Sequence, residues 1–152
     1  MRLGKDKTDW FSLDVGLRQG CILSPTLFSI FIDSLARKVR KVGGIRYSNV
    51  NVSLLLFADD IVLMAESEEN LQKMLDVVAE HSRLFRFLFN KDKSNVMIFG
   101  QAKNSVNRQK FYLGQDELKI VDKHKYLGMW LDQTFSWTLR AQKKMSGIFG
   151  LG

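Results

Sequence analysis

The 152-residue sequence is poor in cysteine, proline and histidine, and each scarcity excludes a class of protein. Its single cysteine, Cys21, cannot form a disulfide within the chain, which favours a reducing, intracellular location, cytoplasmic or nuclear. A single proline and the lack of serine-rich or purely charged tracts argue against a long disordered linker. The two isolated histidines, His81 and His124, do not form a transition-metal motif and are expected at the surface or on a helix face.

Long apolar runs are also missing. The longest, such as residues 52–58, fall far below the roughly 20 residues needed to cross a bilayer, so no membrane contact is predicted. The first ten residues lack the apolar segment of a signal peptide. What remains is an ordinary globular composition, 45% hydrophobic and 26% charged, which is sufficient for one domain with its own core.

The net charge of +7 is unevenly distributed. Residues 1–58 carry +5, residues 59–90 carry −4, and residues 91–152 carry +6. An acidic segment between two basic ones is expected if a polyanion is held around a cation-dependent centre. Solvated surface lysines would give the same totals, so the charge alone leaves both interpretations open.

Hydrophobic periodicity predicts two helices. The first begins at Ser24, with Pro25 in its first turn, and ends at the glycine pair 43–44. The second begins after the cap Ser67, with acidic residues in its first turn. Their expected buried stripes are Leu27, Phe31, Leu35 and Val39 in the first helix, and Leu71, Leu75, Val78 and Phe85 in the second.

Strands are predicted around and between these helices. They cover residues 11–15, 53–57, 61–65, 95–100, 110–114, 117–121 and 125–131, with 95–100 returning to the sheet of 53–65 and 110–121 forming a hairpin. A basic amphipathic helix could follow residue 134. The pattern predicts an α+β fold in which helices pack on one face of a mainly antiparallel sheet.

Two adjacent aspartates, Asp59 and Asp60, lie between two apolar runs. If those runs pair as a hairpin, both carboxylates sit at its tip, where at about 4 Å and an effective dielectric near 20 they repel by roughly 4 kcal/mol. A cation would offset this repulsion, and magnesium prefers oxygen ligands in two-metal sites that hold phosphates. Such pairs are also common on solvated surfaces, so the pair alone does not decide the function.

Four motifs in order carry a resemblance to a known family. "GLRQGCILSPTLFSIFID", "LLLFADDIVLMAES", "FNKDKSNVMIFG" and "HKYLGMWLD" resemble consecutive palm motifs in the reverse transcriptases of non-LTR retrotransposons. The similarity runs from about Phe11 to Trp137. It implies a right-hand polymerase palm over residues 1–133 and the start of a basic helical thumb or connection over residues 134–152.

The resemblance also implies roles for individual residues. Asp59 is the principal magnesium ligand in a two-metal site, and Asp60 its supporting partner. Gln19 and Gly20 lie beside the incoming nucleotide and the template, although a structural loop with a buried glutamine is the alternative. Ala58 would leave room for the primer end or nucleotide, although a small residue in a tight sheet serves equally well.

Two further elements match the family. Lys93 corresponds to a lysine near the triphosphate that could donate a proton to pyrophosphate. Lys91 is the competing candidate, and a solvated loop lysine is the alternative to both. Residues Tyr126, Leu127 and Gly128 correspond to the primer-grip turn, which positions the primer 3′ end by its backbone.

The sequence departs from the family in two places. Residues 85–89 carry Arg86 and Phe87 where a tryptophan or glycine is expected, which puts the local turn in doubt. The first catalytic carboxylate of the family lies on a strand well before the Gln-Gly loop. Asp6, Asp9 and Asp14 lack its sequence context, and so the chain resembles a palm fragment without that carboxylate or the fingers.

The expected function is RNA-directed DNA polymerisation, with an RNA template, a DNA primer, deoxynucleotide triphosphates and magnesium. A catalytically inactive nucleic-acid-binding fragment is the first alternative, and an α+β module for protein contacts is the second. Trp10, Trp130 and Trp137 are expected in the core or at caps, although one could stack on a base. The oligomeric state is not indicated by the sequence.

Overall fold

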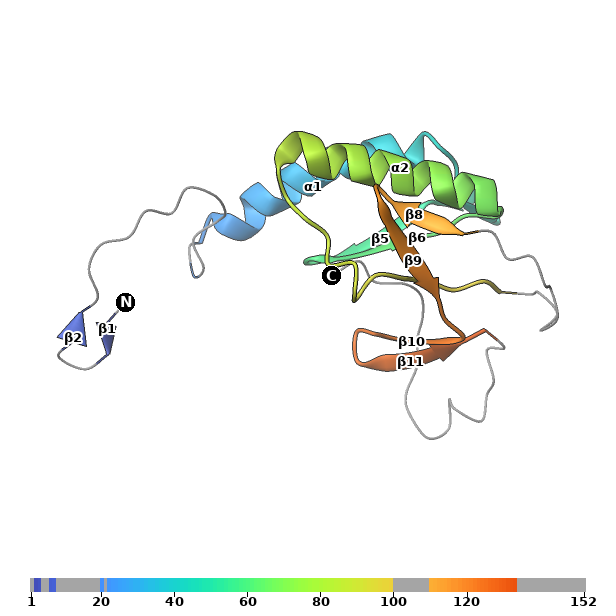
Figure 1. Cartoon of the computed structure of the whole chain (residues 1–152). Helices are drawn as coiled ribbons and strands as arrows, with labels where there is room; N and C mark the ends of the chain where they lie inside the picture. The colour runs from blue at the N-terminus through green and yellow to red at the C-terminus, as the bar shows by residue number, and fades with distance from the viewer. Residues whose placement is uncertain (1, 4–5, 8–19, 21, 100–109, 134–152) are drawn as a thin grey trace. The chain divides into compact units, whose positions relative to one another are not determined.

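The computed structural model describes residues 2–3, 6–7, 20, 22–99 and 110–133 (Figure 1). The chain divides into two compact units, Met1–Asp33 and Ser34–Gly152, and their boundary falls within the first helix. The helices are α1 (Ser24–Arg40) and α2 (Glu68–Phe85). The strands are β1 (Arg2–Leu3), β2 (Asp6–Lys7), β3 (Ile45–Tyr47), β4 (Val50–Val52), β5 (Leu54–Phe57), β6 (Asp60–Leu63), β7 (Asn95–Val96), β8 (Phe111–Leu113), β9 (Asp116–Ile120), β10 (Lys123–Tyr126) and β11 (Met129–Asp132).

Helix α1 starts at the predicted serine–proline pair and ends three residues before the predicted glycines. In its expected stripe, Leu35 and Val39 are fully buried, whereas Leu27 is 51% exposed. The prediction for Leu27 was wrong, and among the described side chains before Ser34 the buried one is Ile32. In the described part of the chain, no helix combines the length and hydrophobicity needed to cross a membrane.

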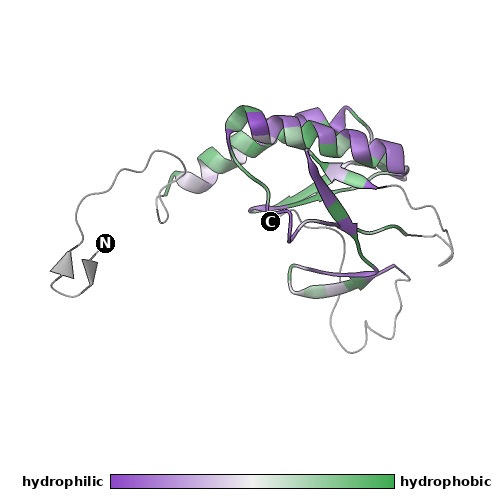
Figure 2. Cartoon of the chain, viewed as in Figure 1, coloured by the Kyte–Doolittle hydropathy of each residue, from purple (hydrophilic) through white to green (hydrophobic). Residues whose placement is uncertain are grey.

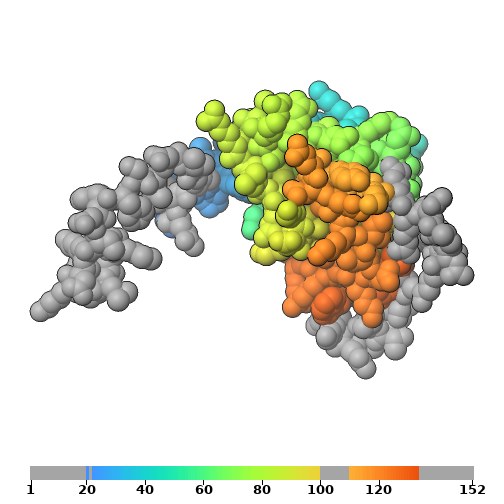
Figure 3. Space-filling view, viewed as in Figure 1, coloured from blue at the N-terminus to red at the C-terminus, as the bar shows by residue number. Residues whose placement is uncertain are grey.

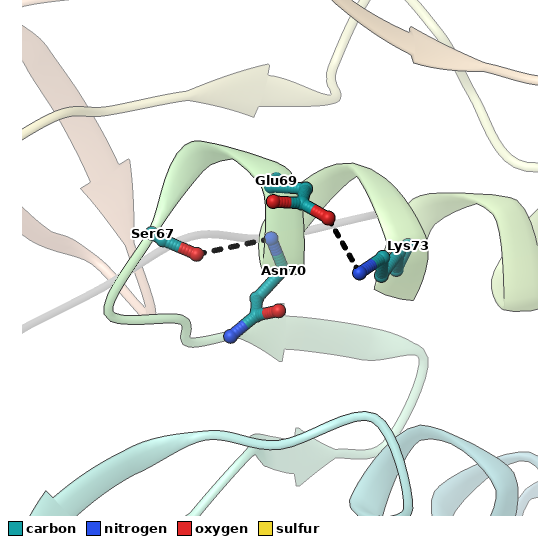
Figure 4. A network of polar contacts seen from close by, with 4 residues as sticks. All are labelled: Ser67, Glu69, Asn70 and Lys73. Carbon is teal, nitrogen blue, oxygen red and sulfur yellow. Dashed lines mark hydrogen bonds and ion pairs between the residues drawn. The ribbon is translucent and has the colours of Figure 1, made fainter.

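The N-terminus of α2 confirms the predicted cap (Figure 4). The backbone of Ser67 is extended, with φ −135°, and its hydroxyl accepts a hydrogen bond of 3.2 Å from the N–H of Asn70. This bond satisfies one of the N–H groups that the first turn leaves without a helical acceptor. One turn on, Lys73 donates to Glu69 at 2.6 Å across i,i+4, and this bond lowers the pKa of Glu69.

The buried face of α2 differs from the expected stripe at its C-terminal end. Leu75 and Val78 are buried as predicted, but Phe85 is 49% exposed. The fully buried His81 continues the stripe instead, so of the two positions expected for it, the surface or a helix face, the structure shows the helix face. It lies three residues after Val78 and seven after the buried Met74, which places it on the same helix face. Hydrophilic residues cover much of the visible side of α2 (Figure 2).

A left-handed residue ends α2. Arg86 has φ 56° and ψ 42°, its N–H bonds to the carbonyl of Ser82, and the N–H of Phe87 bonds to the same carbonyl at 3.2 Å. The bond from Phe87 and the left-handed residue are features of a Schellman motif, whose left-handed position favours glycine. The turn therefore forms without the glycine or tryptophan that the family resemblance led us to expect at residues 85–89.

The described strands form five small sheets rather than one. Four are antiparallel pairs, namely β1–β2, β3–β4, β5–β6 and β10–β11. The fifth has the order β7–β9–β8, in which β7 runs parallel to β9. Two helices with mainly antiparallel strands agree with the α+β class, while the palm-like arrangement stays a prediction.

Two strand predictions were wrong, and the β1–β2 and β3–β4 hairpins were not predicted. Within residues 95–99 only β7 is a strand, and it joins β9 instead of the sheet of β5–β6. Residues 125–131 do not form one strand, because the chain reverses between β10 and β11. The β3–β4 hairpin is mostly exposed on both faces, so its sequence carries no clear alternation. The strand predicted at 11–15 and the helix predicted from 134 lie outside the described residues.

Strand β5 forms an apolar edge. Within the described residues its hydrogen-bonded neighbour is β6 alone. Leu55, Leu56 and Phe57 are 40%, 37% and 60% exposed, whereas Ile61 and Val62 on β6 are buried. The hairpin is therefore anchored through β6.

Packing links strands that are not joined by hydrogen bonds. Val62 of β6, Tyr126 of β10 and Leu131 of β11 form one buried cluster with Met97. Burial of each aliphatic side chain contributes roughly 1.5–3 kcal/mol, so the cluster holds the β5–β6 hairpin against the β10–β11 hairpin. In the space-filling view the segment after α2 (yellow) lies against β8–β11 (orange) (Figure 3).

Candidate functional site

The two predicted catalytic aspartates lie at the turn between β5 and β6. Phe57 pairs with Asp60, so the two turn residues are Ala58 and Asp59. Ala58 has φ 51°, which is the positive φ that tight two-residue hairpins require at their first position. Asp59 is exposed, as predicted, but Asp60 is the first residue of β6 and is half-buried. The two aspartates therefore lie at and beside the turn, as predicted, although the Asp60 side chain is less exposed than expected.

The strand register directs Asp60 toward the β10–β11 hairpin. Side chains alternate along β6, so Asp60 shares a face with Val62, which packs against Tyr126. Burial raises the pKa of Tyr126, and the carboxylate of Asp60 raises it further. Burial also lowers the pKa of His124, while Asp60 acts in the opposite direction. The structure thus brings one predicted catalytic residue close to the first residue of the predicted primer-grip turn.

Residues 126–128 do form a turn. Tyr126 pairs with Met129, and the two residues between them, Leu127 and Gly128, have φ 46° and 83°. Two successive positive φ angles define a type I′ hairpin turn. A Cβ atom on Gly128 would meet nothing within 4 Å, so glycine suits this position through its backbone freedom and not through lack of space. Leu127 is 44% exposed at the tip.

The two candidate lysines differ in their surroundings. Lys91 forms an ion pair of 2.9 Å with Asp116, and this bond raises the pKa of Lys91. Lys93 is exposed in a turn whose N–H groups bond back to Asn90, and its own N–H donates to the Asn90 carbonyl at 3.2 Å. Both lysines are exposed, and among the described residues an ion pair is formed by Lys91 but not by Lys93. No described contact joins Lys93 to Asp59 or Asp60.

The remaining predicted site residues are less well defined. Gln19 lies outside the described residues. Gly20 is exposed in a turn with φ 81°, a conformation that glycine adopts at no steric cost. It belongs to the unit Met1–Asp33, whereas the aspartates belong to the other unit. Ala58 is exposed at the hairpin turn, so it is not the tightly packed small residue that was the alternative interpretation.

Asp59 and Asp60 supply part of a donor set for a divalent cation. Carboxylate oxygens are the ligands that magnesium prefers, and Asp59 is accessible to solvent. Among the described residues, however, no three or more histidine, cysteine, aspartate or glutamate side chains are grouped closely enough to hold a metal ion. The described residues therefore show no metal site, and Asp59 and Asp60 offer two carboxylates toward one.

The sequence did not reveal the proximity of Asp60 to His124 and Tyr126. These residues are more than sixty positions apart, and β6 and β10 belong to different sheets. The only local signal is alternation within β6, which shows that Asp60 and Val62 share a face. What that face contacts depends on the fold.

Comparisons with known proteins identify relatives of the chain. The family described as reverse transcriptase (RNA-dependent DNA polymerase) matches residues 2–131. The chain is 37% identical to the Retrovirus-related Pol polyprotein from type-2 retrotransposable element R2DM of Drosophila melanogaster, over 75% of this chain and 11% of that protein. It is 30% identical to the Pol polyprotein from type-1 retrotransposable element R2 of Popillia japonica, over 74% of this chain and 17% of that protein. It thus spans a small part of these relatives, and it belongs to the reverse transcriptase family, in the form carried by non-LTR retrotransposons.

Proposed function

We propose that this chain forms part of the catalytic core of an RNA-directed DNA polymerase encoded by a retrotransposon. The reaction is attack of a DNA primer 3′-hydroxyl on the α-phosphate of a deoxynucleotide triphosphate, directed by an RNA template, with release of pyrophosphate. The observation that carries the proposal is the packing of the Asp59–Asp60 turn against the β10–β11 hairpin through Val62 and Tyr126. This packing holds an accessible carboxylate near a second tight turn.

The proposed roles follow from these positions. Asp59 is the principal ligand for magnesium, and Asp60 supports it from the start of β6. When bound, the metal would stabilise the charge that develops on the phosphate oxygens. A further carboxylate from another segment of a longer protein would complete the donor set. Residues 126–128 position the primer end through their backbone.

Substrate-binding roles are proposed for the other family positions. Lys93 lies near the triphosphate and donates a proton to the leaving pyrophosphate, a role that suits an exposed lysine better than the ion-paired Lys91. Gln19 and Gly20 position the nucleotide and template. Residues 1–133 are proposed to be a palm fragment and residues 134–152 the start of a thumb or connection, in an intracellular protein.

The test uses the longer protein that contains this segment. Magnesium-dependent incorporation on an RNA template should fall by about 10²-fold or more in Asp59→Asn, because one group that stabilises charge in the transition state is lost. Asp76→Asn makes the same chemical change at an exposed site on α2 and should leave incorporation unchanged. Equal activity of the two variants would overturn the proposed role of Asp59.

A second candidate function is nucleic-acid binding without catalysis by this chain alone. It is favoured by the lack, among the described residues, of a metal-binding group of three or more side chains. Incorporation assays on the purified 152-residue chain distinguish the two functions.

A further inference from the structure

We infer that the outward face of the β10–β11 hairpin binds a single-stranded nucleic acid, with Trp130 stacking on a base and Lys125 contacting a neighbouring phosphate. This inference rests on the proposed function and names a contact surface beyond the catalytic turn. It concerns side chains on the strands, whereas the proposed primer contact uses the backbone of the turn at 127–128.

The register of the hairpin places these groups together. Lys125 lies directly opposite Trp130, and Lys123 lies opposite Asp132. Directly opposed residues have Cβ atoms about 5 Å apart and project to the same face. Lys123, by contrast, lies opposite a carboxylate, Asp132, which is buried. Lys125 is therefore the ammonium group best placed beside the Trp130 ring.

The two faces of the hairpin differ in burial. Tyr126 and Leu131 are 6% and 3% exposed and belong to the buried cluster, so their face is filled by the protein itself. Trp130 projects to the opposite face and is 43% exposed. This exposure excludes the core position expected for the tryptophan and leaves a capping position and base stacking as the alternatives. An indole ring on a short hairpin with two exposed lysines, Lys123 and Lys125, offers a stacking platform beside positive charge.

The charge favours nucleic acid over a protein as the occupant of this face. The two lysines fall in residues 91–152, which carry a net charge of +6. Single-strand-binding surfaces combine lysines that follow the phosphates with aromatic rings that accept any base. A surface that docked another protein would be expected to carry fewer lysines at its centre.

The test measures binding of the 152-residue chain to fluorescein-labelled single-stranded RNA and DNA of one sequence by fluorescence anisotropy. Trp130→Ala should weaken binding by about tenfold, and Trp130→Phe should restore most of it because a ring is still present. Lys125→Gln should weaken binding and reduce the salt slope by about one. The RNA and DNA arms show which strand is preferred.

Matched controls are available on the neighbouring sheet. Tyr112→Ala removes an exposed aromatic of similar exposure, 39%, and should leave binding unchanged. Lys110→Gln removes an exposed lysine that already forms an ion pair of 2.9 Å with Glu117, and should have a smaller effect than Lys125→Gln. Thermal unfolding of each variant checks that the fold persists.

A readout specific to stacking completes the test. In a Trp10→Phe, Trp137→Phe background, the fluorescence of Trp130 should be quenched on adding the oligonucleotide. Binding that stays intact in Trp130→Ala, or an unquenched Trp130, would overturn the inference while leaving the proposed polymerase function standing. If Asp59→Asn loses incorporation while Trp130→Ala leaves oligonucleotide binding unchanged, the inference is overturned and the proposed polymerase function stands. If the chain bound neither oligonucleotide, the inference would be wrong together with the binding part of the proposed function.

Discussion

At the residue scale, Arg86 shows how a departure from the family pattern is accommodated. The left-handed conformation costs a non-glycine residue roughly 1–2 kcal/mol, because its Cβ crowds the following carbonyl oxygen. Two hydrogen bonds to the Ser82 carbonyl nevertheless fix the turn. The resemblance pointed to a tryptophan or a glycine in this neighbourhood, and the backbone explains why a glycine would suit position 86.

Replacing this residue should stabilise the protein. Arg86→Gly relieves the left-handed strain but increases the freedom of the unfolded chain, so we expect a net gain of about 0.5–1 kcal/mol in the free energy of unfolding. Arg83→Gly, in the last turn of α2, should instead lower the free energy of unfolding by about 1 kcal/mol, because glycine has a low helix propensity. Urea denaturation measures both. A loss of stability in Arg86→Gly would contradict the strain argument.

His81 makes the stability of the fold sensitive to acid. Burial lowers its pKa below the ordinary value of 6.5, and the charge of Lys38 lowers it further. The imidazole lies 4.3 Å from the Phe85 ring, and Nε2 lies 3.3 Å from the Ser34 hydroxyl. Below pH 6.5 the unfolded chain therefore binds a proton more readily than the folded one does.

The free energy of unfolding should accordingly be at its full value above pH 6.5 and decrease as the pH falls below it. His81→Gln should be less stable at neutral pH but should show a shallower decrease toward acid. His124, whose pKa burial also lowers, contributes a similar slope, so His124→Gln is the companion variant. Identical pH slopes in the wild type and His81→Gln, measured by urea titration at several pH values, would count against this assignment.

At the element scale, four hairpins have two-residue turns formed by different residues, and the turn at 127–128 differs from the other three because both of its residues have positive φ. Each has two turn residues, and the first has positive φ: Ser48, Ala58, Gly114 and Leu127. Only Gly114 is the residue type that adopts this conformation freely. The proposed catalytic turn and the proposed primer turn thus both begin with a residue that the conformation disfavours.

Exchanging alanine and glycine between two equivalent turns tests this cost. Ala58→Gly should raise the free energy of unfolding by about 0.5–1 kcal/mol, and Gly114→Ala should lower it by a similar amount. A Cβ at position 114 would meet Ala79 at 3.8 Å, an ordinary contact, so the loss would arise from the backbone. If both variants had the same free energy of unfolding as the wild type in urea denaturation, positive φ would carry no cost at these turns.

At the scale of the whole molecule, local signals predicted more than long-range ones. The cap at Ser67 and the hairpin at Asp59 were predicted because their signals lie within a few residues. The turn at 127–128 was missed in the strand pattern because the apolar residues around Gly128 read as one continuous strand. The parallel pairing of β7 with β9 and the approach of Asp60 to Tyr126 depend on packing between distant segments.

The isolated chain should be catalytically inactive. Only the Asp59–Asp60 side of a two-metal site is provided by the described residues, and losing one group of this kind commonly costs about 10²-fold or more. The purified 152-residue protein and its Asp59→Asn variant should both show background incorporation on an RNA template with magnesium. Strong synthesis that depends on Asp59 would show that Asp6, Asp9, Asp14 or a second copy supplies the missing carboxylate.

The edge of β5 bears on how the protein behaves in concentrated solution. Within the described structure, one side of this strand leaves backbone N–H and C=O groups without a neighbouring strand, beside the exposed Leu55 and Phe57. Such an edge is a template for self-association into extended sheets. We therefore expect solubility to limit expression of the chain by itself, and Leu55→Lys to improve it, since a lysine on an edge strand opposes pairing between copies.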